Sequence, residues 1–285
     1  EERLDLTHLP AYAIDDEGNQ DPDDALSLED DRLWVHVADV AALVPIDGAL
    51  DREARARGAN QYLPERMVNM LPPEITERLG LGLQEISPAL SFGFGCDEAG
   101  EVKDVTIQRT WVKVERLSYE AAEGRLDESP FASMGALVER FRHRRHANDA
   151  AGIELPEVSL RVRGGEVVIR PLPRLRSRAL VMDAMLMAGE AVAVVCRDQG
   201  IPIPYVTQPA PDKVEQPADL AGMYAYRRRF KPSRLVGEPA PHFGLGLPVY
   251  TRATSPLRRY SDLLVHQQLR TWLRGEPPID ARTVA

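Results

Sequence analysis

The chain has 285 residues, of which 44% are hydrophobic and 28% charged, a composition that excludes disordered, collagen-like and coiled-coil proteins. It is long enough to bury a sizeable core. Its 35 Lys and Arg residues against 44 Asp and Glu give a formal net charge of −9, which argues against a protein that coats nucleic acid or an anionic membrane over its whole surface, so any basic site must be local.

Cysteine content and apolar stretches give expectations for the compartment. Cys96 and Cys196 are too few for a disulfide framework and lack metal-ligand spacing, which favours buried thiols in a reducing compartment, the cytoplasm. The most apolar stretch, residues 179–196, contains Asp183 and Glu190, and we expect it to be too short and too polar to span a bilayer. No leader sequence is visible, and a start without methionine is typical of an excerpt or a processed form. We expect a monomer without membrane contact.

The front of the chain reads as extended structure followed by a short helix. Residues 25–28 are extended in pattern, residues 33–37 alternate with a period of two, and the polar link between them predicts a β-hairpin. Residues 47–57 predict a short charged helix. A proline-flanked loop over 63–73 follows it, and two further strands are expected within 101–114.

Three longer helices are predicted after that. Residues 134–148 place apolar side chains on one face and arginines elsewhere, which predicts an amphipathic helix with a basic side. Residues 179–197 repeat apolar side chains at helical spacing, with acidic residues off that stripe. A Ser-Pro pair at 255–256 supplies the N-cap and the first-turn proline of a helix over 257–273. The pattern indicates a mixed α/β (α+β) fold in one domain.

The densest chemical signal is acidic: residues 13–31 hold nine carboxylates and no Lys or Arg. Such crowding repels itself unless a hard divalent cation neutralises it, and Mg²⁺ or Ca²⁺ prefers oxygen ligands of this kind. Gly18 and Asn19 would let the chain turn back, so that Asp15 faces the aspartates that follow. A solvated acidic turn explains the same composition, and no spacing matches an EF-hand loop. Asp16 falls at the turn, where a charge is easily solvated.

A second signal lies in residues 251–262, which place Arg258 and Arg259 in the first turn of the predicted helix. Cations there oppose the helix dipole, so either the pair faces solvent or an anion such as phosphate binds at that end. Adjacent helical side chains point in different directions, so at most one of the two arginines can aim into a given pocket. An acidic metal site combined with such an arginine is suited to metal-assisted phosphoryl transfer.

These segments resemble the signature blocks of the ribonuclease II / ribonuclease R family, whose catalytic module is called the RNB domain. The resemblance rests on several blocks in the family's order rather than on one motif. The blocks are residues 14–27, 35–40, 61–64, 70–72, 117–119, 241–247 and 250–266.

The resemblance implies an RNB-type catalytic domain, in which a mixed sheet is flanked by helices around an RNA channel. It implies an Mg²⁺-dependent hydrolytic exoribonuclease, which threads single-stranded RNA into the channel with its 3′ end first and releases 5′-nucleoside monophosphates. The whole chain, residues 1–285, would be one such module. The oligonucleotide-binding barrels that flank it in the family, and its usual last helix, are expected to be missing.

The resemblance also assigns residues. The metal positions are Asp15, Asp21, Asp23 and Asp24, the catalytic residues are Asp23 and Arg258, and the substrate contacts are Tyr62, Tyr119, His242, Arg258 and Arg259. In the family's pattern Tyr62 lies at the terminal nucleotide, and Tyr119 influences the length of the product and the preference for RNA. For both tyrosines, a core position with a satisfied hydroxyl is the alternative.

Three departures from the family limit these assignments. Met182 stands where the family often carries glutamate, and its side chain cannot accept a hydrogen bond from a ribose hydroxyl. No aromatic residue lies at 152–154, where some members clamp the 3′-terminal base. Without the flanking domains, many phosphate contacts would also be lost, so we expect weaker RNA binding.

Alternatives remain open at this point. The basic runs at 140–145 and 227–231 are either solvated faces or contacts to RNA phosphates. A catalytically inactive RNA-binding module would keep the same fold. Without the family resemblance, a Mg²⁺-dependent phosphatase acting on small substrates would also explain the acidic and arginine-bearing segments.

Overall fold

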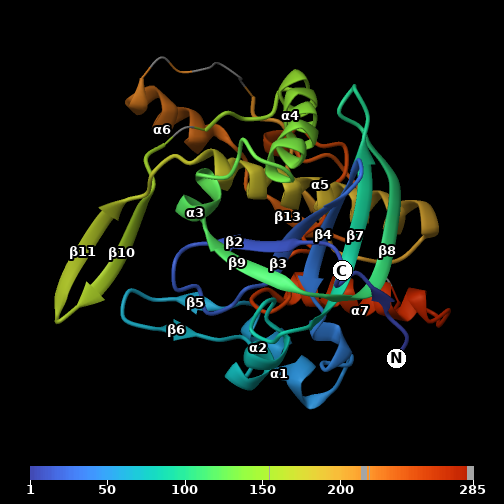
Figure 1. The fold of residues 1–285 in the computed structure, drawn as a ribbon. Helices are drawn as coiled ribbons and strands as arrows, with labels where there is room; N and C mark the ends of the chain where they lie inside the picture. The colour runs from blue at the N-terminus through green and yellow to red at the C-terminus, as the bar shows by residue number, and fades with distance from the viewer. Residues whose placement is uncertain (154, 213–216, 218, 281–285) are drawn as a thin grey trace.

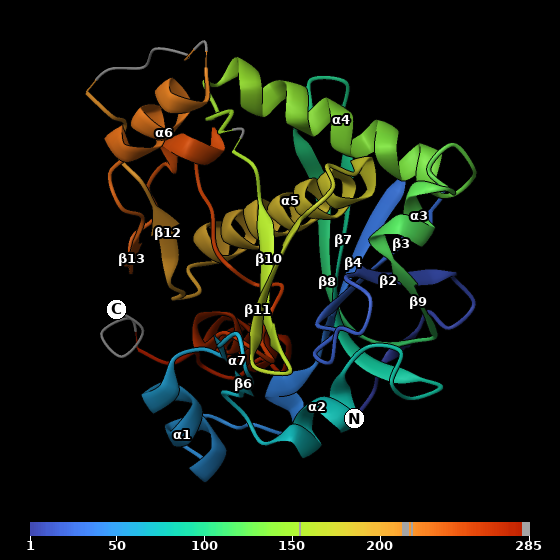
Figure 2. The same ribbon diagram turned by 90° about the vertical axis from the view of Figure 1, so that its left-hand side faces the viewer.

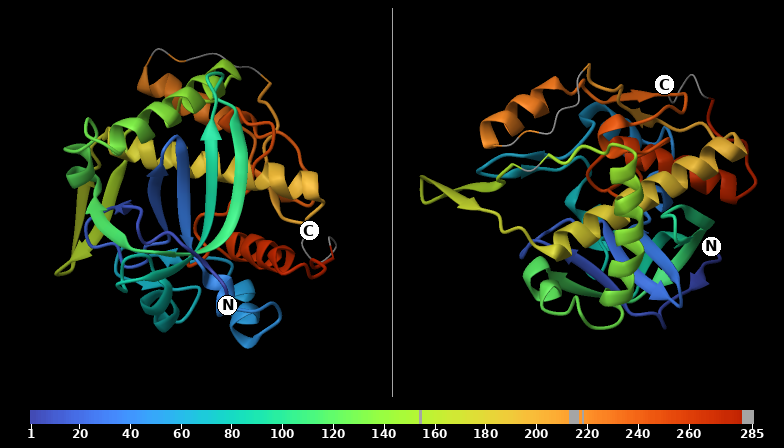
Figure 3. Two further views of the ribbon diagram at one scale, coloured as in Figure 1. Left: turned by 45° about the vertical axis from the view of Figure 1, so that its right-hand side comes forward. Right: turned by 90° about the horizontal axis from the view of Figure 1, so that it is seen from above.

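A curled sheet of seven strands organises the computed structural model, which describes all residues except 154, 213–216, 218 and 281–285 (Figure 1). Across the sheet the strands are β1 (Leu4–Asp5), β8 (Val102–Val112), β7 (Ser87–Cys96), β4 (Arg32–Ala38), β3 (Asp24–Glu29), β2 (Ala11–Asp15) and β9 (Val114–Ser118). Neighbours are antiparallel except for two parallel pairs, β1 with β8 and β2 with β9. Only Lys113 separates β8 from β9, which lie near opposite edges of the strand order, so the sheet must curl strongly (Figure 3).

The hairpin predicted at the front of the chain is confirmed, whereas the strands predicted within 101–114 are placed differently. β3 and β4 pair antiparallel along their length, and Asp30 turns between them with φ 52°. Residues 102–112 form one strand, β8, whose antiparallel partner β7 lies upstream of the predicted range. The turn between β7 and β8 contains Gly100 at φ +83°, a conformation that glycine adopts without Cβ strain, so the hairpin closes earlier than predicted.

Helices cover both faces of the sheet and create two hydrophobic cores (Figure 2). α4 (Phe131–Ala147) and α5 (Arg176–Gln199) cover one face, and η1 (Val40–Ala42), α1 (Ala49–Arg57), α2 (Pro73–Leu79) and the first turn of α7 (Tyr260–Leu273) pack on the other. β4 divides its side chains between them: Val35 and Val37 lie in the first core, and Trp34 and Ala38 lie in the second. Side chains therefore alternate between the two faces of β4, which is the period of two from which the strand was predicted.

The arginines predicted to form a basic side of the first of these helices lie at the interface between α4 and α5. Both helices are confirmed, but the arginines of α4 turn inward: Arg142 and Arg145 each donate to Asp183 at 2.7 Å. Arg144 donates in the same way to Glu190. Asp183 is 0% exposed and Glu190 is 3% exposed, so the carboxylates predicted to lie off the apolar stripe are buried with their partners. Arg144 and Arg145 are therefore internal to the fold, and Arg142 is half-buried.

α5 is long and apolar enough, by length and composition alone, to cross a membrane, so the expectation that this stretch is too short and too polar is wrong on that test. In the fold, 72% of its apolar window is buried inside the molecule. The core helix of a soluble protein passes the same test of length and composition. Burial against the sheet and α4 accounts for the apolar sequence of α5.

Two small hairpins project beside the loop that joins β2 to β3 (Figure 1). β5 (Gln61–Tyr62) and β6 (Met67–Val68) form one of them, inside the stretch predicted as a proline-flanked loop. β10 (Val158–Arg163) and β11 (Glu166–Pro171) form the other. The Val162 amide donates to the Pro64 carbonyl oxygen at 3.1 Å, so the two hairpins are joined.

The remaining described elements are α3 (Tyr119–Glu123), β12 (Tyr205–Thr207), α6 (Leu220–Arg229), β13 (Arg234–Val236) and η2 (Phe243–Leu245). The second basic run begins at the C-terminal end of α6, where Arg227 and Arg228 are exposed. Its contact with RNA stays a prediction. Cys96 and Cys196 are both buried free thiols, as predicted.

Candidate active site

The acidic segment forms the loop between β2 and β3. β2 ends at Asp15 and β3 begins at Asp24, and because these strands are antiparallel neighbours, the ends of the loop lie close together. Gly18 turns the loop with φ +79°. The Asn19 amide donates to Asp15 Oδ2 at 2.6 Å, and Asn19 Oδ1 accepts from the Asp21 N–H at 3.2 Å. The predicted turn at Gly18 and Asn19 is confirmed.

Asp21 and Asp23 are buried and hydrogen-bonded to distant parts of the chain. Asp21 Oδ2 accepts from the Tyr62 hydroxyl at 2.6 Å. Asp23 Oδ1 accepts from the Leu257 N–H at 2.8 Å, and Asp23 Oδ2 accepts from Arg258 Nε at 3.0 Å. These carboxylates therefore connect the acidic loop with β5 and with the segment that precedes α7.

α7 starts later than the sequence predicted, and this difference places the two arginines. The helix begins at Tyr260, because residues 58–60 and 258–260 pair as extended backbone with N–H···O distances of 2.8 and 2.9 Å. Arg258 therefore lies in a turn ahead of the helix, and Arg259 is the N-cap residue. The prediction of a helix capped by the Ser-Pro pair at 255–256 is wrong for this reason.

The two arginines have different partners. Arg258 bonds to Asp23 and lines the cleft described next. Arg259 donates to both oxygens of Asp262 at 2.6 and 3.0 Å, and Asp262 is 0% exposed. The expectation that at most one of the two arginines aims into a given pocket is confirmed. Arg259, predicted as a substrate contact, is bonded to a carboxylate of the helix that it caps, and its contact with substrate stays a prediction.

A cleft of about 660 Å³ opens beside the acidic loop. Its walls are residues 15–21 of that loop, the β5–β6 hairpin with Tyr62, Leu160 of β10, and Arg258. Tyr62 is 57% exposed, so its ring remains accessible while its hydroxyl is tied to Asp21. The cleft thus combines carboxylates, a guanidinium and an accessible aromatic ring.

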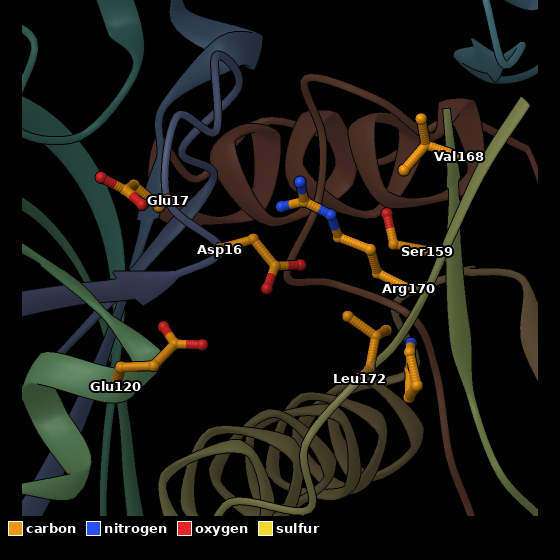
Figure 4. A pocket seen from close by; sticks show the side chains of 8 residues that line it. Asp16, Glu17, Glu120, Ser159, Val168, Arg170 and Leu172 are labelled. Carbon is orange, nitrogen blue, oxygen red and sulfur yellow. The ribbon is translucent and has the colours of Figure 1, made fainter. Parts of the chain in front are cut away.

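A second pocket of about 410 Å³ adjoins the cleft at the tip of the loop (Figure 4). Asp16 and Glu17 line both hollows, so the loop tip stands between them. Glu120 of α3 and Arg170 of β11 enter the second pocket from opposite walls. The acidic loop is therefore accessible from two directions.

Burial and mutual repulsion raise the pKa of several carboxylates in the loop. Burial raises the pKa of Asp23 well above its ordinary value, although Arg258 opposes the shift. Burial also raises the pKa of Asp24 to about 7, and the charge of Asp15 adds to this. The pKa of Asp15 is raised by its own burial and by neighbouring carboxylates. An added positive charge would relieve this repulsion.

This donor set fits a hard divalent cation by its chemistry. The four aspartates of the loop offer only oxygen ligands, as Mg²⁺ prefers, and the pKa is raised in three of them. The Asp24 carboxylate accepts no hydrogen bond from any described residue, which leaves its oxygens available to a cation. Within the part of the chain that the structure describes, no three acidic, His or Cys side chains are already grouped as ligands of one ion.

The structure separates the remaining predicted residues. Tyr119 begins α3 directly after Ser118, which pairs with Asp15 at the end of β2, and burial together with the charges of Asp15 and Asp24 raises the pKa of Tyr119. His242 lies elsewhere, in a pocket of about 620 Å³, where its Nδ1 accepts from the Leu245 N–H at 3.3 Å and burial lowers its pKa to about 4. Of the predicted residues, Asp15, Asp21, Tyr62 and Arg258 line the cleft, and Asp23 is bonded to Arg258 behind them. Asp24 begins β3 directly after Asp23, and Tyr119 follows the strand partner of Asp15. Arg259 and His242 are not among the residues that line the cleft.

Two residues of the site were missed by the sequence reasoning. Asn60 donates to Asp21 at 3.1 Å, and its Oδ1 accepts from the Met70 N–H at 2.6 Å. Its position next to the matched block 61–64 was the available signal. Arg178 bonds to the acidic loop from the first turn of α5. It is a cation at the start of a helix, the same signal that drew attention to Arg258.

A sequence profile of the RNB domain family matches residues 3–223 and 217–275. An uncharacterized ribonuclease of Synechocystis is 38% identical over 97% of this chain and 44% of its own length. The chloroplastic/mitochondrial ribonuclease II of Arabidopsis thaliana is 31% identical over 96% of this chain and 37% of its own length. The chain therefore spans less than half the length of these two relatives.

Solved structures share the fold. RNase R of Mycoplasma genitalium, in complex with ribose-methylated single-stranded RNA, matches with a TM-score of 0.83 and 22% identity over 95% of this chain and 51% of its own. An active-site mutant of the Dss1 exoribonuclease of Candida glabrata matches with a TM-score of 0.88 and 22% identity, over 98% and 42%. Yeast Ssd1, a pseudonuclease, matches with a TM-score of 0.81 and 21% identity, over 99% and 42%. These matches confirm the predicted fold class.

Proposed function

Because the chain belongs to the RNB domain family, we propose that it is a hydrolytic exoribonuclease, which degrades single-stranded RNA from the 3′ end and releases 5′-nucleoside monophosphates. One observation carries the proposal. Arg258 is held by buried Asp23 and lines the same cleft as residues 15–21 of the acidic loop. A phosphodiester in this cleft would lie between a guanidinium and carboxylates suited to a metal ion, which is the arrangement that phosphate hydrolysis needs.

Arg258 is oriented for phosphate by its partners. Its Nε donates to Asp23 and its Nη2 donates to Ser255 Oγ at 3.1 Å, which fixes the plane of the guanidinium. Nη1 makes no hydrogen bond to a described residue, so it is available to an oxygen of the scissile phosphate. A planar guanidinium gives charge-assisted hydrogen bonds to phosphate oxygens and offsets the charge that develops during hydrolysis.

We propose that the four aspartates of the loop hold Mg²⁺, with Asp23 shared between the cation and Arg258. When bound, Mg²⁺ makes a coordinated water more acidic and offsets the charge on the phosphate. Asp24 and Asp15 have raised pKa values and are the carboxylates that gain most from a nearby cation. Asp21 links this group to Tyr62, because it accepts the tyrosine hydroxyl.

Tyr62 and Tyr119 are the proposed contacts to the RNA itself. The ring of Tyr62 is accessible from the cleft, and base–aromatic stacking contributes about 1–3 kcal/mol per base. The hydrogen bond from its hydroxyl to Asp21 holds the ring beside the acidic loop. Tyr119 follows Ser118, the strand partner of Asp15, and we propose that it limits how far the 3′ end can advance.

An RNA-binding module without catalysis is the second candidate. Two observations favour it: the yeast pseudonuclease shares the fold, and both oxygens of Asp23 are already engaged by protein donors. The complete set of four aspartates together with Arg258 favours the enzyme.

Incubation of 5′-labelled single-stranded RNA with the protein tests the proposal. We expect a ladder that shortens from the 3′ end in Mg²⁺ and no cleavage after chelation with EDTA. Small phosphomonoesters should remain intact, which separates the exonuclease from a phosphatase. Binding of RNA without any cleavage would identify the inactive module. We also propose that the protein acts as a monomer in the cytoplasm, which its two buried free thiols support.

A further inference from the structure

Arg178 occupies an electrostatically unfavourable position at the start of α5. The first turn of this helix contains no acidic residue, and cations there oppose the helix dipole. Arg176, in the same turn, is largely exposed and pairs with carboxylates near the surface. The side chain of Arg178 is only 24% exposed and turns toward the acidic loop, where it donates to Asp16. The fold therefore holds this cation in place for a reason other than helix stability.

The guanidinium of Arg178 lies over the ring of Tyr119. Its central carbon is 4.1 Å from the ring centroid, while the other arginine–aromatic contacts of the described chain measure 5.1 to 5.8 Å. Stacking of this kind fixes the plane of the ring. The Nε of Arg178 is buried without a hydrogen-bond partner among the described residues, so the stacked geometry is kept although a donor is left unsatisfied.

The backbone around this contact is also fixed. Ser177 Oγ donates to the Tyr119 carbonyl oxygen at 2.8 Å, and the Ser177 N–H donates to Glu123 Oε2 at 2.8 Å. α3 and the start of α5 are thereby locked together, with Arg178 and Tyr119 facing each other. Arg178 also donates to Asp16, which follows Asp15 in the chain, so the acidic loop is connected to the same group of residues.

We propose that Arg178 is a positioning residue: anchored by Asp16, it holds the ring of Tyr119 beside the acidic loop and thereby sets the length of RNA at which degradation stops. The inference rests on the proposed exonuclease activity. It gives Asp16, a residue that the sequence alone assigns to a solvated turn, a part in the same arrangement. It makes the position of Tyr119 depend on two residues that do not themselves need to touch RNA.

The test compares Arg178→Met with a matched control, Arg176→Met, on short and long 5′-labelled oligoribonucleotides. Arg178→Met should leave a final fragment of altered length and slow cleavage of short substrates about fivefold, the factor expected from the loss of a partly buried cation–π contact. Long substrates, which keep other contacts, should be cleaved nearly as fast as by the wild type. Arg178→Lys keeps the charge for Asp16 but loses the planar stack, so it should shift the final fragment as well. Arg176→Met should match the wild type in both measurements.

A double-mutant cycle with Tyr119→Ala separates positioning from general stability. If Arg178 acts through Tyr119, adding Arg178→Met to Tyr119→Ala should change neither the final fragment nor the rate further. Additive effects, or an Arg178→Met variant with the wild-type end product, would overturn the inference. If the wild type binds RNA without cleaving it, the proposed function fails; the same cycle, measured on affinity for a short oligoribonucleotide, then decides whether Arg178 acts through Tyr119. Thermal unfolding of each variant checks that the fold is retained.

Discussion

Arginine–carboxylate pairs occupy two regions of this molecule, and they differ in what remains unsatisfied around them. Between α4 and α5, Arg142 and Arg145 converge on Asp183, which is completely buried. In the cleft, Arg258 pairs with Asp23, which is also buried, but the arginine side chain is 39% exposed and lines an open hollow. The same pair of chemical groups therefore serves as closed packing in one place and as an open site in the other.

The difference shows that the surroundings of an ion pair, rather than its presence, indicate function. Asp183 receives bonds from two arginines and is 0% exposed, so its charge is matched within the fold. Asp23 has one arginine and stands among further carboxylates whose pKa values are raised, which is a local excess of negative charge. An excess of that kind beside a cleft is a place for a cation and a phosphate, whereas a saturated group has nothing left to bind.

The largest expected effect is on stability, in the closed region, by which we mean the arginine–carboxylate pairs between α4 and α5. Asp183→Ala leaves the buried Arg145 and the half-buried Arg142 without their carboxylate, and removal of one partner of a buried pair costs about 3–5 kcal/mol. Urea unfolding should show this loss, while the turnover of RNA by the folded fraction should change little. Glu139→Gln, which breaks an exposed pair with Arg142, is the control and should cost less than about 1 kcal/mol. Equal losses in both variants would contradict the distinction between closed and open pairs.

The next effect is on activity, in the open region, by which we mean the cleft with Asp23 and Arg258. Arg258→Lys keeps the charge but loses the planar fork, so turnover should fall about 100-fold, equivalent to about 2.7 kcal/mol. Arg259→Lys is the matched control, because Arg259 is bound to Asp262 outside the cleft, and its turnover should stay within about threefold of the wild type. Steady-state rates on one single-stranded RNA measure both. Similar small losses at the two positions would remove Arg258 from the catalytic role.

The smallest effect concerns the rim of the open region. Tyr62→Ala removes both the accessible ring and the hydroxyl bond to Asp21, and it should weaken binding of short oligoribonucleotides about tenfold more than binding of long ones. Tyr62→Phe keeps the ring and should lose less, about threefold. Binding titrations with short and long RNA give both ratios. A loss independent of RNA length would return Tyr62 to a purely structural role.

Local chemistry made the open region predictable from the sequence. The crowding of carboxylates over residues 13–31 pointed to a cation, and Gly18 with Asn19 pointed to the turn that brings Asp15 toward Asp21. The hairpin at the front and the long helices also followed from residue periodicity. These signals lie within a few residues of one another, so they survive without knowledge of the tertiary fold.

The closed region was not predictable in this way, because it depends on contacts between distant segments. The arginine run of α4 looks like a solvated face until Asp183, on another helix, is known to lie opposite. The start of α7 was predicted too early for the same reason: backbone pairing of residues 58–60 with 258–260 overrides the local capping signal. Arg178 was missed because its partner Asp16 is 162 residues away in the sequence, so no local pattern connects them.

The central claim is that the Asp23–Arg258 pair belongs to a working phosphodiesterase site, and single-turnover cleavage of 5′-labelled RNA by Asp23→Asn tests it most directly. Burial already raises the pKa of Asp23, so the uncharged amide should be accommodated in the fold. We predict that cleavage falls at least about 100-fold while RNA binding, measured in the same reaction, stays near the wild-type level. A variant that retains more than about a tenth of the wild-type rate, a loss below about 1.4 kcal/mol, would contradict the account.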